Sequence, residues 1–336
     1  MNSTYRTILC FCCLLLLACA DRESSAGPKA SQGVVPLSLE DIVANDAGAL
    51  FAVVETSAGL SFMLPLELCP ASAVDLLLEG VYFPRPLTHN LLLAAADSLG
   101  IVVRDIVLTL GAEAAPEARV GLVGDGESAL MAALGDALAL HYASGVPLLA
   151  TTALVEHFSA VERAPKTVGT PAAFAAARRR ARLAQADTTP VEMGVLGLVQ
   201  SATDLAVVLI DPSQHRAFPV FIGFCQASSI VAILQNEGGP AVRSHQLFVD
   251  LLRGQGVSVE YARIVGLHGD TYIGALLLRA GDRSIVLDAR PSDAIALALR
   301  TGAPVQLARF LLDELGEQAG PYQALFANET GKLVLR

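Results

Sequence analysis

The chain has 336 residues, of which 53% are hydrophobic and 17% charged, and its formal net charge is −10. This length predicts two domains, and the apolar fraction excludes a disordered chain because most of the sequence must bury a core. The acidic balance argues against a protein that holds nucleic acid mainly through a wide basic surface.

Residues 1–18 predict a secretory signal peptide. A polar start with one positive charge, Arg6, precedes an apolar run of eleven residues that is too short to span a bilayer. Cys19 follows Leu-Leu-Ala, which resembles the lipobox of bacterial lipoproteins, where this cysteine becomes the acylated N-terminus. The alternative is an ordinary signal peptide that is cut nearby.

The resemblance implies export and attachment to a membrane through a lipid on Cys19. Residues 19–33 then form a polar tether between the lipid and the fold. The first acidic residue after Cys19 is Asp21, which follows Ala20 and does not stand directly after the cysteine. This position favours the outer membrane of the bacterial envelope over the inner one.

The body of the chain is a duplication. A shift of 156 residues aligns rare residue types of the two halves, and one residue of slippage extends the match. A period this long indicates two copies of a whole domain. We assign the copies to 34–158 and 191–316, with an Ala/Arg/Pro linker at 159–190 and a loosely attached tail at 317–336. The aligned segments are Cys69–Ser72 with Cys225–Ser228, Thr88–Leu91 with Ser244–Leu247, and Asp136–Leu140 with Asp293–Leu297.

Two cysteines, Cys69 and Cys225, remain after the signal peptide and Cys19. One disulfide between them is open in an oxidising compartment. Their equivalence in the repeat weakens this idea, because equivalent positions in two separate domains need not be neighbours.

The second copy predicts a mixture of strands and helices without strict alternation, which is typical of the α+β class. We therefore expect two tandem copies of a mixed-sheet domain with flanking helices. The predicted strands span 191–199, 205–210, 217–222, 257–265, 272–278, 284–287 and 305–307, and the predicted helices span 226–235, 244–253, 291–299 and 310–315, with Gly302 as a stop signal after the third helix.

The segment Leu287–Arg300, Leu-Asp-Ala-Arg-Pro-Ser-Asp-Ala-Ile-Ala-Leu-Ala-Leu-Arg, resembles the signature of the bifunctional nuclease domain family. A second family motif, Arg-Pro-x-Thr-His, is better kept in the first copy, at Arg85–His89. The resemblance implies DNase and RNase activity. In the first copy the segment Met131–Asp136 keeps only Asp136 of the signature, so we expect that copy to be degenerate.

The candidate catalytic residues are His245, Asp288, Arg290 and Asp293 of the second copy. Phosphodiester hydrolysis needs a group that takes a proton from water and positive charge facing the phosphate. We expect Arg290 to clamp the phosphate, His245 to act as acid or base, and Asp288 and Asp293 to meet at one sheet edge, where they could hold Mg²⁺ or Mn²⁺. The structural alternative is that Ser292 caps a helix, Asp293 complements its dipole and Arg290 braces the turn.

Charge favours the second copy as the place where single-stranded DNA or RNA binds. Residues 34–157 hold 3 basic and 15 acidic side chains, whereas residues 191–316 hold 9 and 12. Three hypotheses stay open at this point: a nuclease carried by the second copy, a non-catalytic lipoprotein whose paired domains bind a partner or small ligand, and an envelope scaffold without a ligand.

Overall fold

The computed structural model describes residues 33–45, 47–78, 86–160, 187–200, 204–235, 243–268 and 271–326. Both copies of the repeat fall within one compact unit, Val34–Arg336. The predicted signal peptide, Cys19 and most of the linker lie outside the described residues. None of the described helices combines the length and the apolar character that a membrane span requires.

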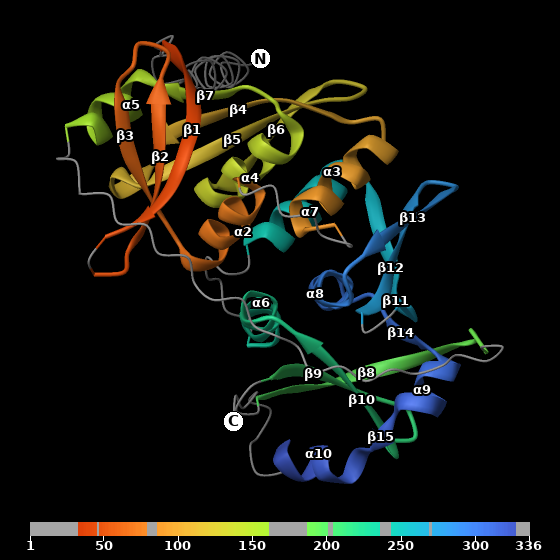
Figure 1. Cartoon of the computed structure of the whole chain (residues 1–336). Coiled ribbons are helices and arrows are strands. Elements are labelled where there is room, and N and C mark those ends of the chain that lie inside the picture. Colours follow the sequence, from red (N-terminus) through yellow and green to blue (C-terminus); the bar gives the residue numbers. More distant parts are fainter. Residues whose placement is uncertain are drawn as a thin grey trace, which may run out of the picture. The chain divides into compact units, whose positions relative to one another are not determined.

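The first copy is a seven-stranded mixed sheet with the order β3-β2-β1-β7-β4-β5-β6, in which β4 and β7 are the parallel pair. Helices α2 and α4 pack against each other and against the sheet (Figure 1). The elements are β1 (Val34–Ala44), β2 (Leu50–Thr56), β3 (Ser61–Leu66), α2 (Leu68–Leu78), α3 (Thr88–Ser98), β4 (Val102–Leu110), the short 3₁₀ helix η1 (Ala112–Ala114), β5 (Pro116–Val123), β6 (Glu127–Ala133), α4 (Leu134–Ser144), β7 (Leu148–Thr151) and α5 (Thr152–Ser159).

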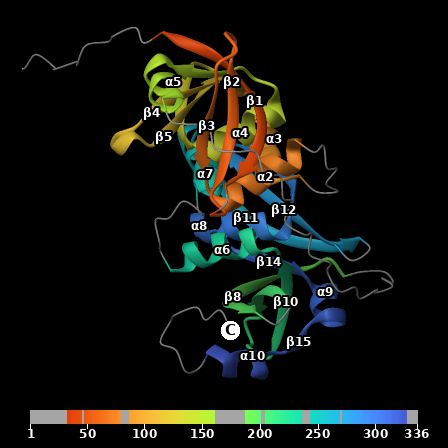
Figure 2. The same cartoon turned by 60° about the vertical axis from the view of Figure 1, so that its left-hand side comes forward.

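The second copy repeats this architecture and adds one strand, giving the order β13-β12-β11-β14-β8-β9-β10-β15. Its parallel pair, β11 with β14, is the counterpart of β4 with β7, and α8 lies against β11 and β12 (Figure 2). The elements are β8 (Pro190–Gln200), β9 (Leu205–Ile210), β10 (Arg216–Ile222), α6 (Phe224–Leu234), α7 (Arg243–Gly254), β11 (Val257–His268), β12 (Thr271–Ala280), β13 (Arg283–Ala289), α8 (Pro291–Thr301), β14 (Val305–Ala308), α9 (Arg309–Leu315), β15 (Glu317–Gln318) and α10 (Ala319–Phe326).

The matching strand orders confirm the duplication and the α+β fold of two mixed-sheet domains. The strand β13 shows why the pattern was readable: Ile285, Leu287 and Ala289 are buried, whereas Val286 and Asp288 between them are exposed. Successive side chains of a strand point to opposite faces, so one apolar face of β13 enters the core.

The helix α8 begins at Pro291, as predicted, and ends just before Gly302, the predicted stop. Gly302 follows it with a left-handed φ of 72°, which glycine adopts without steric cost. The residue that caps its start is Arg290 in an extended conformation, and Pro291 is the first helical residue. Ser292, the cap in the structural alternative, is instead the second helical residue, because proline is favoured at the first helical position.

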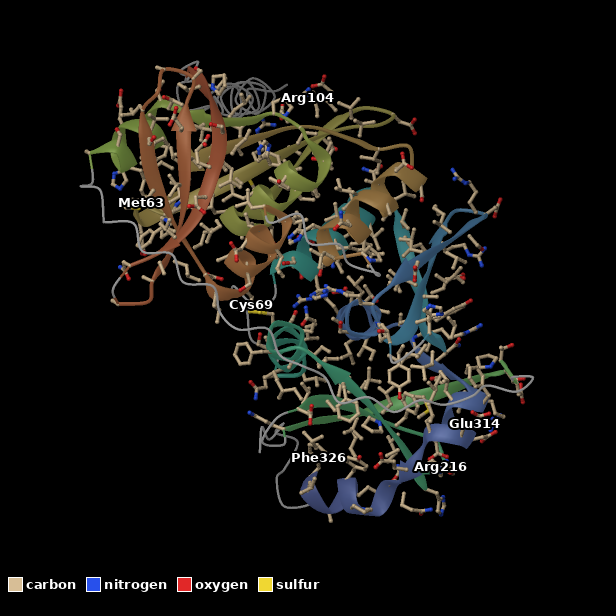
Figure 3. The ribbon with its side chains drawn as sticks, viewed as in Figure 1. Met63, Cys69, Arg104, Arg216, Glu314 and Phe326 are labelled. Carbon is tan, nitrogen blue, oxygen red and sulfur yellow. A yellow bond between two sulfur atoms is a disulfide. The ribbon has the colours of Figure 1, made fainter. Side chains whose placement is uncertain are left out.

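The prediction of a loosely attached tail from residue 317 is wrong for the part that the structure describes. The strand β15 extends the sheet beside β10, and Ala319 at the start of α10 is 1% exposed. Arg216 holds the preceding turn by donating to the carbonyl oxygens of Leu312 at 2.6 Å and Gly316 at 2.9 Å (Figure 3). The predicted strand at 333–335 lies outside the described residues.

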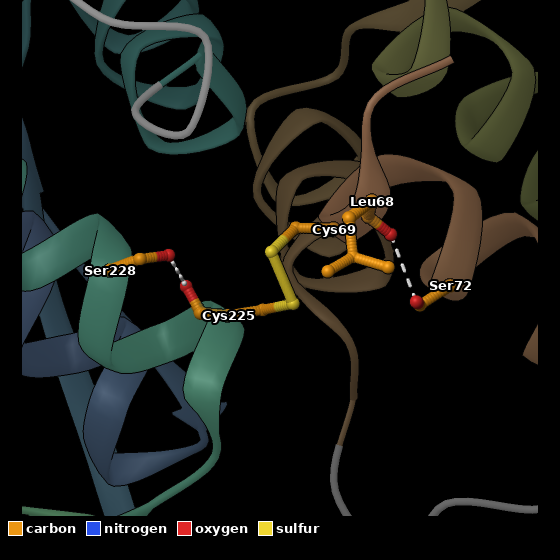
Figure 4. Close-up of a disulfide and its surroundings, with 5 residues drawn as sticks. All are labelled: Leu68, Cys69, Ser72, Cys225 and Ser228. Carbon is orange, nitrogen blue, oxygen red and sulfur yellow. Dashed lines mark hydrogen bonds between the residues drawn. A yellow bond between two sulfur atoms is a disulfide. The ribbon is translucent and has the colours of Figure 1, made fainter. Parts of the chain in front are cut away.

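The two copies are joined by a disulfide between Cys69 in α2 and Cys225 in α6 (Figure 4). Their Cα atoms are 5.5 Å apart, within the usual range for such a bond. The disulfide that the sequence leaves open is thus formed, and the repeat equivalence of the two cysteines does not keep them apart. Residues that a repeat relates do become neighbours when both copies present the same surface to each other, as in a two-fold dimer.

Helices also make contacts across the boundary between the copies. The helices α3 and α7 contact each other, α3 contacts β13 of the second copy, and α7 contacts β6 of the first. These contacts are reciprocal, because α3 and α7 are repeat equivalents, as are β6 and β13. The copies therefore meet through one surface that both share.

Candidate functional site at the boundary of the copies

The carboxylate of Asp293 is the centre of a polar cluster. Asp293 is the third residue of α8 and is 0% exposed. Its Oδ1 atom accepts hydrogen bonds from His245 Nε2 at 3.0 Å and from Thr88 Oγ1 at 2.8 Å, and its Oδ2 atom accepts one from Arg290 Nε at 2.6 Å. Thr88 begins α3 of the first copy, so the cluster is built from both copies.

Arg290 and His245 are held by further contacts. Arg290 Nη2 donates to Thr88 Oγ1 at 3.1 Å, and the Arg290 side chain keeps 22% of its surface exposed. The second ring nitrogen of His245, Nδ1, lies 2.9 Å from the hydroxyl of Ser229 in α6. Because Nε2 donates to a carboxylate and Nδ1 is already paired, the buried imidazole is fixed in orientation.

The charge of Asp293 is stabilised in place. Burial alone would raise the pKa of Asp293, but Arg290 and His245 outweigh it and hold the pKa well below its ordinary value. Asp293 is therefore an ionised acceptor, which suits it for positioning Arg290.

The first copy has a counterpart cluster around Asp136. Asp136 is 1% exposed, and its Oδ1 atom lies 2.9 Å from His89 Nε2 and 2.5 Å from Oγ of Ser244, a residue of the second copy. Each copy thus contributes a hydroxyl, Thr88 or Ser244, to the carboxylate of the other. The residues are repeat equivalents, so the boundary carries two related His–Asp pairs.

The structure brings together three of the four predicted site residues, His245, Arg290 and Asp293. Asp288 lies exposed on β13. The predicted metal pair of Asp288 and Asp293 does not fit, because Asp293 is fully buried and both of its oxygens already accept hydrogen bonds. The described residues contain no group of three or more His, Cys, Asp or Glu side chains placed to hold a metal ion.

The structure also gives His245 another role than the predicted acid or base. The exposed fraction of His245 is 5%, and both of its nitrogens are engaged within the protein. These contacts suit His245 to the role of a positioning residue. It orients Asp293, and Asp293 in turn orients Arg290.

Sequence reasoning missed the contributions of Thr88, Ser229 and Ser244. A signal was present for two of them, since the repeat aligns Thr88-His89 with Ser244-His245 and Asp136 with Asp293. A hydroxyl next to the histidine recurs in both copies, and its partner lies across the boundary. The spacing of these residues along the chain does not indicate that each hydroxyl contacts the carboxylate of the other copy.

A comparison with known protein families identifies this fold. The model described as the bifunctional nuclease domain matches residues 53–163 and 207–319, which together make about two thirds of the chain. The chain belongs to the bifunctional nuclease domain family. The two matched regions fall one in each copy, so the family domain occurs twice in tandem.

Curated relatives of this bifunctional nuclease domain protein resemble a single copy. Two uncharacterized proteins from two strains of Mycobacterium tuberculosis are each 33% identical to it over 127 residues. The match covers 37% of this chain and 76% of each relative. The aligned length is close to that of one copy of the repeat.

Proposed function

We propose that the second bifunctional nuclease domain hydrolyses phosphodiester bonds of single-stranded DNA or RNA, with Arg290 as the phosphate-binding group. The observation that carries the proposal is that the Arg290 guanidinium is fixed by Asp293 and Thr88 while 22% of its side chain faces solvent. A planar guanidinium presents paired N–H donors to phosphate oxygens, and orientation in advance lowers the cost of binding.

Asp288 supplies the exposed carboxylate in this proposal. It stands two residues before Arg290 at the end of β13, and Arg290 continues the extended backbone with φ −67° and ψ 143°. Side chains two residues apart in an extended chain point to the same side. Asp288 is thus the candidate for taking the proton of the attacking water, while Asp293, His245 and Thr88 position Arg290.

The test is a cleavage assay on the whole protein, because Thr88 of the first copy belongs to the site. Fluorescent single-stranded DNA and RNA are incubated with wild-type protein in Mg²⁺, in Mn²⁺ and in EDTA. Arg290→Lys and Asp288→Asn are each expected to lower the cleavage rate by about 100-fold or more, since each removes a group that acts on the transition state.

A matched control in this assay is Arg253→Lys, which alters an exposed arginine on α7 that pairs with Asp250. It should leave the rate within a factor of about two. If Arg290→Lys and Asp288→Asn both cleave at the wild-type rate, neither Arg290 nor Asp288 takes part in the reaction.

A second candidate function is non-catalytic binding by the paired domains. Two observations favour it: the His–Asp clusters are buried at the boundary, and the apolar side chains of Leu68 and Phe224 stand 52% and 59% exposed beside the disulfide. Exposed apolar side chains that gather on one surface mark a contact site for another molecule. Absence of cleavage by the wild-type protein on both substrates favours this candidate.

We also propose that the protein is an exported lipoprotein held in the envelope by a lipid on Cys19, with the outer membrane as the favoured location. The Leu-Leu-Ala-Cys segment after an apolar run supports this. Cys19→Ala is expected to abolish labelling of the protein by radioactive palmitate and to move it from the membrane to the soluble fraction. Cys13→Ala, inside the apolar run, should change neither result, and equal labelling of both variants contradicts the proposal.

A further inference from the structure

The two clusters at the boundary differ in one charged group. In the second copy, Oδ2 of Asp293 accepts a hydrogen bond from Arg290. In the first copy, Oδ2 of Asp136 is buried and has no hydrogen-bond partner among the residues that the structure describes. The same carboxylate oxygen is therefore paired with a guanidinium in one copy and left without a donor in the other.

The sequence explains the missing partner. Ala133 occupies in the first copy the position that Arg290 occupies in the second. Both residues cap the following helix in the same backbone conformation, with φ −67° and ψ 153° at Ala133 and φ −67° and ψ 143° at Arg290. Ala133 is half-buried and ends at its methyl group, so this position offers no donor to Oδ2 of Asp136.

The histidine of the first cluster also lacks a partner that its counterpart has. Nδ1 of His89 also has no partner within the described part of the chain, whereas its counterpart in His245 pairs with Ser229. The residue aligned with Ser229 is Ala73. The first copy has therefore kept the buried pair of His89 and Asp136. It lacks counterparts of Arg290 and Ser229, which complete the cluster in the second copy.

The acidic balance of the first copy favours a cation over an anion as its ligand. Residues 34–157 hold 15 acidic and 3 basic side chains. Of the three basic residues, Arg104 pairs with Asp105 and Glu127, Arg119 lies 3.6 Å from Asp105, and Arg85 lies outside the described residues. A buried carboxylate oxygen without a donor is unfavourable, and an incoming donor cation relieves that cost.

We propose that the first copy binds a small ligand that carries a guanidinium group, which donates to Oδ2 of Asp136 in the place of the arginine that this copy lacks. The ligand enters beside the half-buried Ala133. The site is separate from the proposed nuclease site and does not depend on cleavage activity.

The experiment is isothermal titration of the whole protein with methylguanidinium chloride at constant ionic strength. We expect saturable binding to the wild type in the millimolar range, and binding at least tenfold weaker in Ala133→Arg, where the protein's own guanidinium fills the site. Ala133→Leu fills the same space without a charge and is expected to weaken binding equally, so the result does not depend on one variant.

Tetramethylammonium chloride is the matched control ligand, because it carries the same charge without N–H donors. It is expected to give no saturable binding. Equal titrations of methylguanidinium into wild type and both Ala133 variants, or equal binding of tetramethylammonium and methylguanidinium, would overturn the proposal. A folded state for each variant is checked by its cooperative thermal unfolding.

Discussion

Replacing Asp293 with asparagine is expected to lower the free energy of unfolding by about 3–5 kcal/mol, since removing one partner of a buried ion pair leaves the other uncompensated. The amide has the shape of the carboxylate but no charge. Arg290 Nε and His245 Nε2 then face a weaker, neutral acceptor, and Arg290 retains its charge at a site where Asp293 is 0% exposed. Chemical denaturation followed by circular dichroism measures the loss.

Asp136→Asn is the matched control, because Asp136 has the same position, burial and histidine partner without an arginine. We expect a smaller loss for this variant, since no guanidinium is left behind. Equal losses in the two variants would show that the ion pair with Arg290 contributes nothing beyond the hydrogen bonds.

The pH dependence of stability provides an independent check. The pKa of Asp293 in the folded protein lies well below its ordinary value of 3.8, so the unfolded chain binds the proton more readily. The stabilisation is therefore fully present above the unfolded pKa and is lost as the pH falls through it toward the folded pKa. The wild type should lose stability more steeply than Asp293→Asn between about pH 5 and pH 2.

Removing the disulfide is the second change with a large expected effect. The double variant Cys69→Ala/Cys225→Ala should lose about 2–5 kcal/mol of unfolding free energy, because the bond closes a long loop in the unfolded chain and the entropic term grows with loop length. The sequence separation of the two cysteines is 156 residues. Urea denaturation of this variant and of the wild type with a reducing agent measures the effect twice.

We expect the double variant and the reduced wild type each to unfold in a single transition, although both lack the disulfide. The bonds of Thr88 to Asp293 and of Ser244 to Asp136 still join the copies, as do the contacts of α3 and α7. Two well-separated transitions after reduction would contradict this expectation, because they would show that the copies are coupled only by the covalent link.

The elements of the second copy were largely predictable because their buried faces carry a clear period. The burial of alternate residues in β13 and the left-handed Gly302 after α8 are local features, which a sequence pattern reports directly. The start of α8 at Pro291 was predictable because proline is favoured at the first helical position, whereas Ser292, the second candidate start signal, lies inside the helix.

The site was predictable only within one copy. His245 stands at the position of one family motif and Arg290 and Asp293 in another, and the three come together in the fold. Thr88 and Cys69 are more than 150 residues away from their partners, and only the pairing of the two copies brings them close. Spacing along a chain carries no information on how two folded units meet, which is why the sequence left the disulfide open.

The contacts of α7 with β6 and of α3 with β13 also bear on solubility. Both strands end their sheets, and the terminal strand of a sheet exposes unpaired backbone groups that invite pairing with another chain. Exposed apolar side chains on the same strands, Met131 at 59% and Val286 at 67%, add to that hazard. Because each copy lays a helix beside this strand of the other, the tandem arrangement shields one edge of each sheet from pairing with another chain.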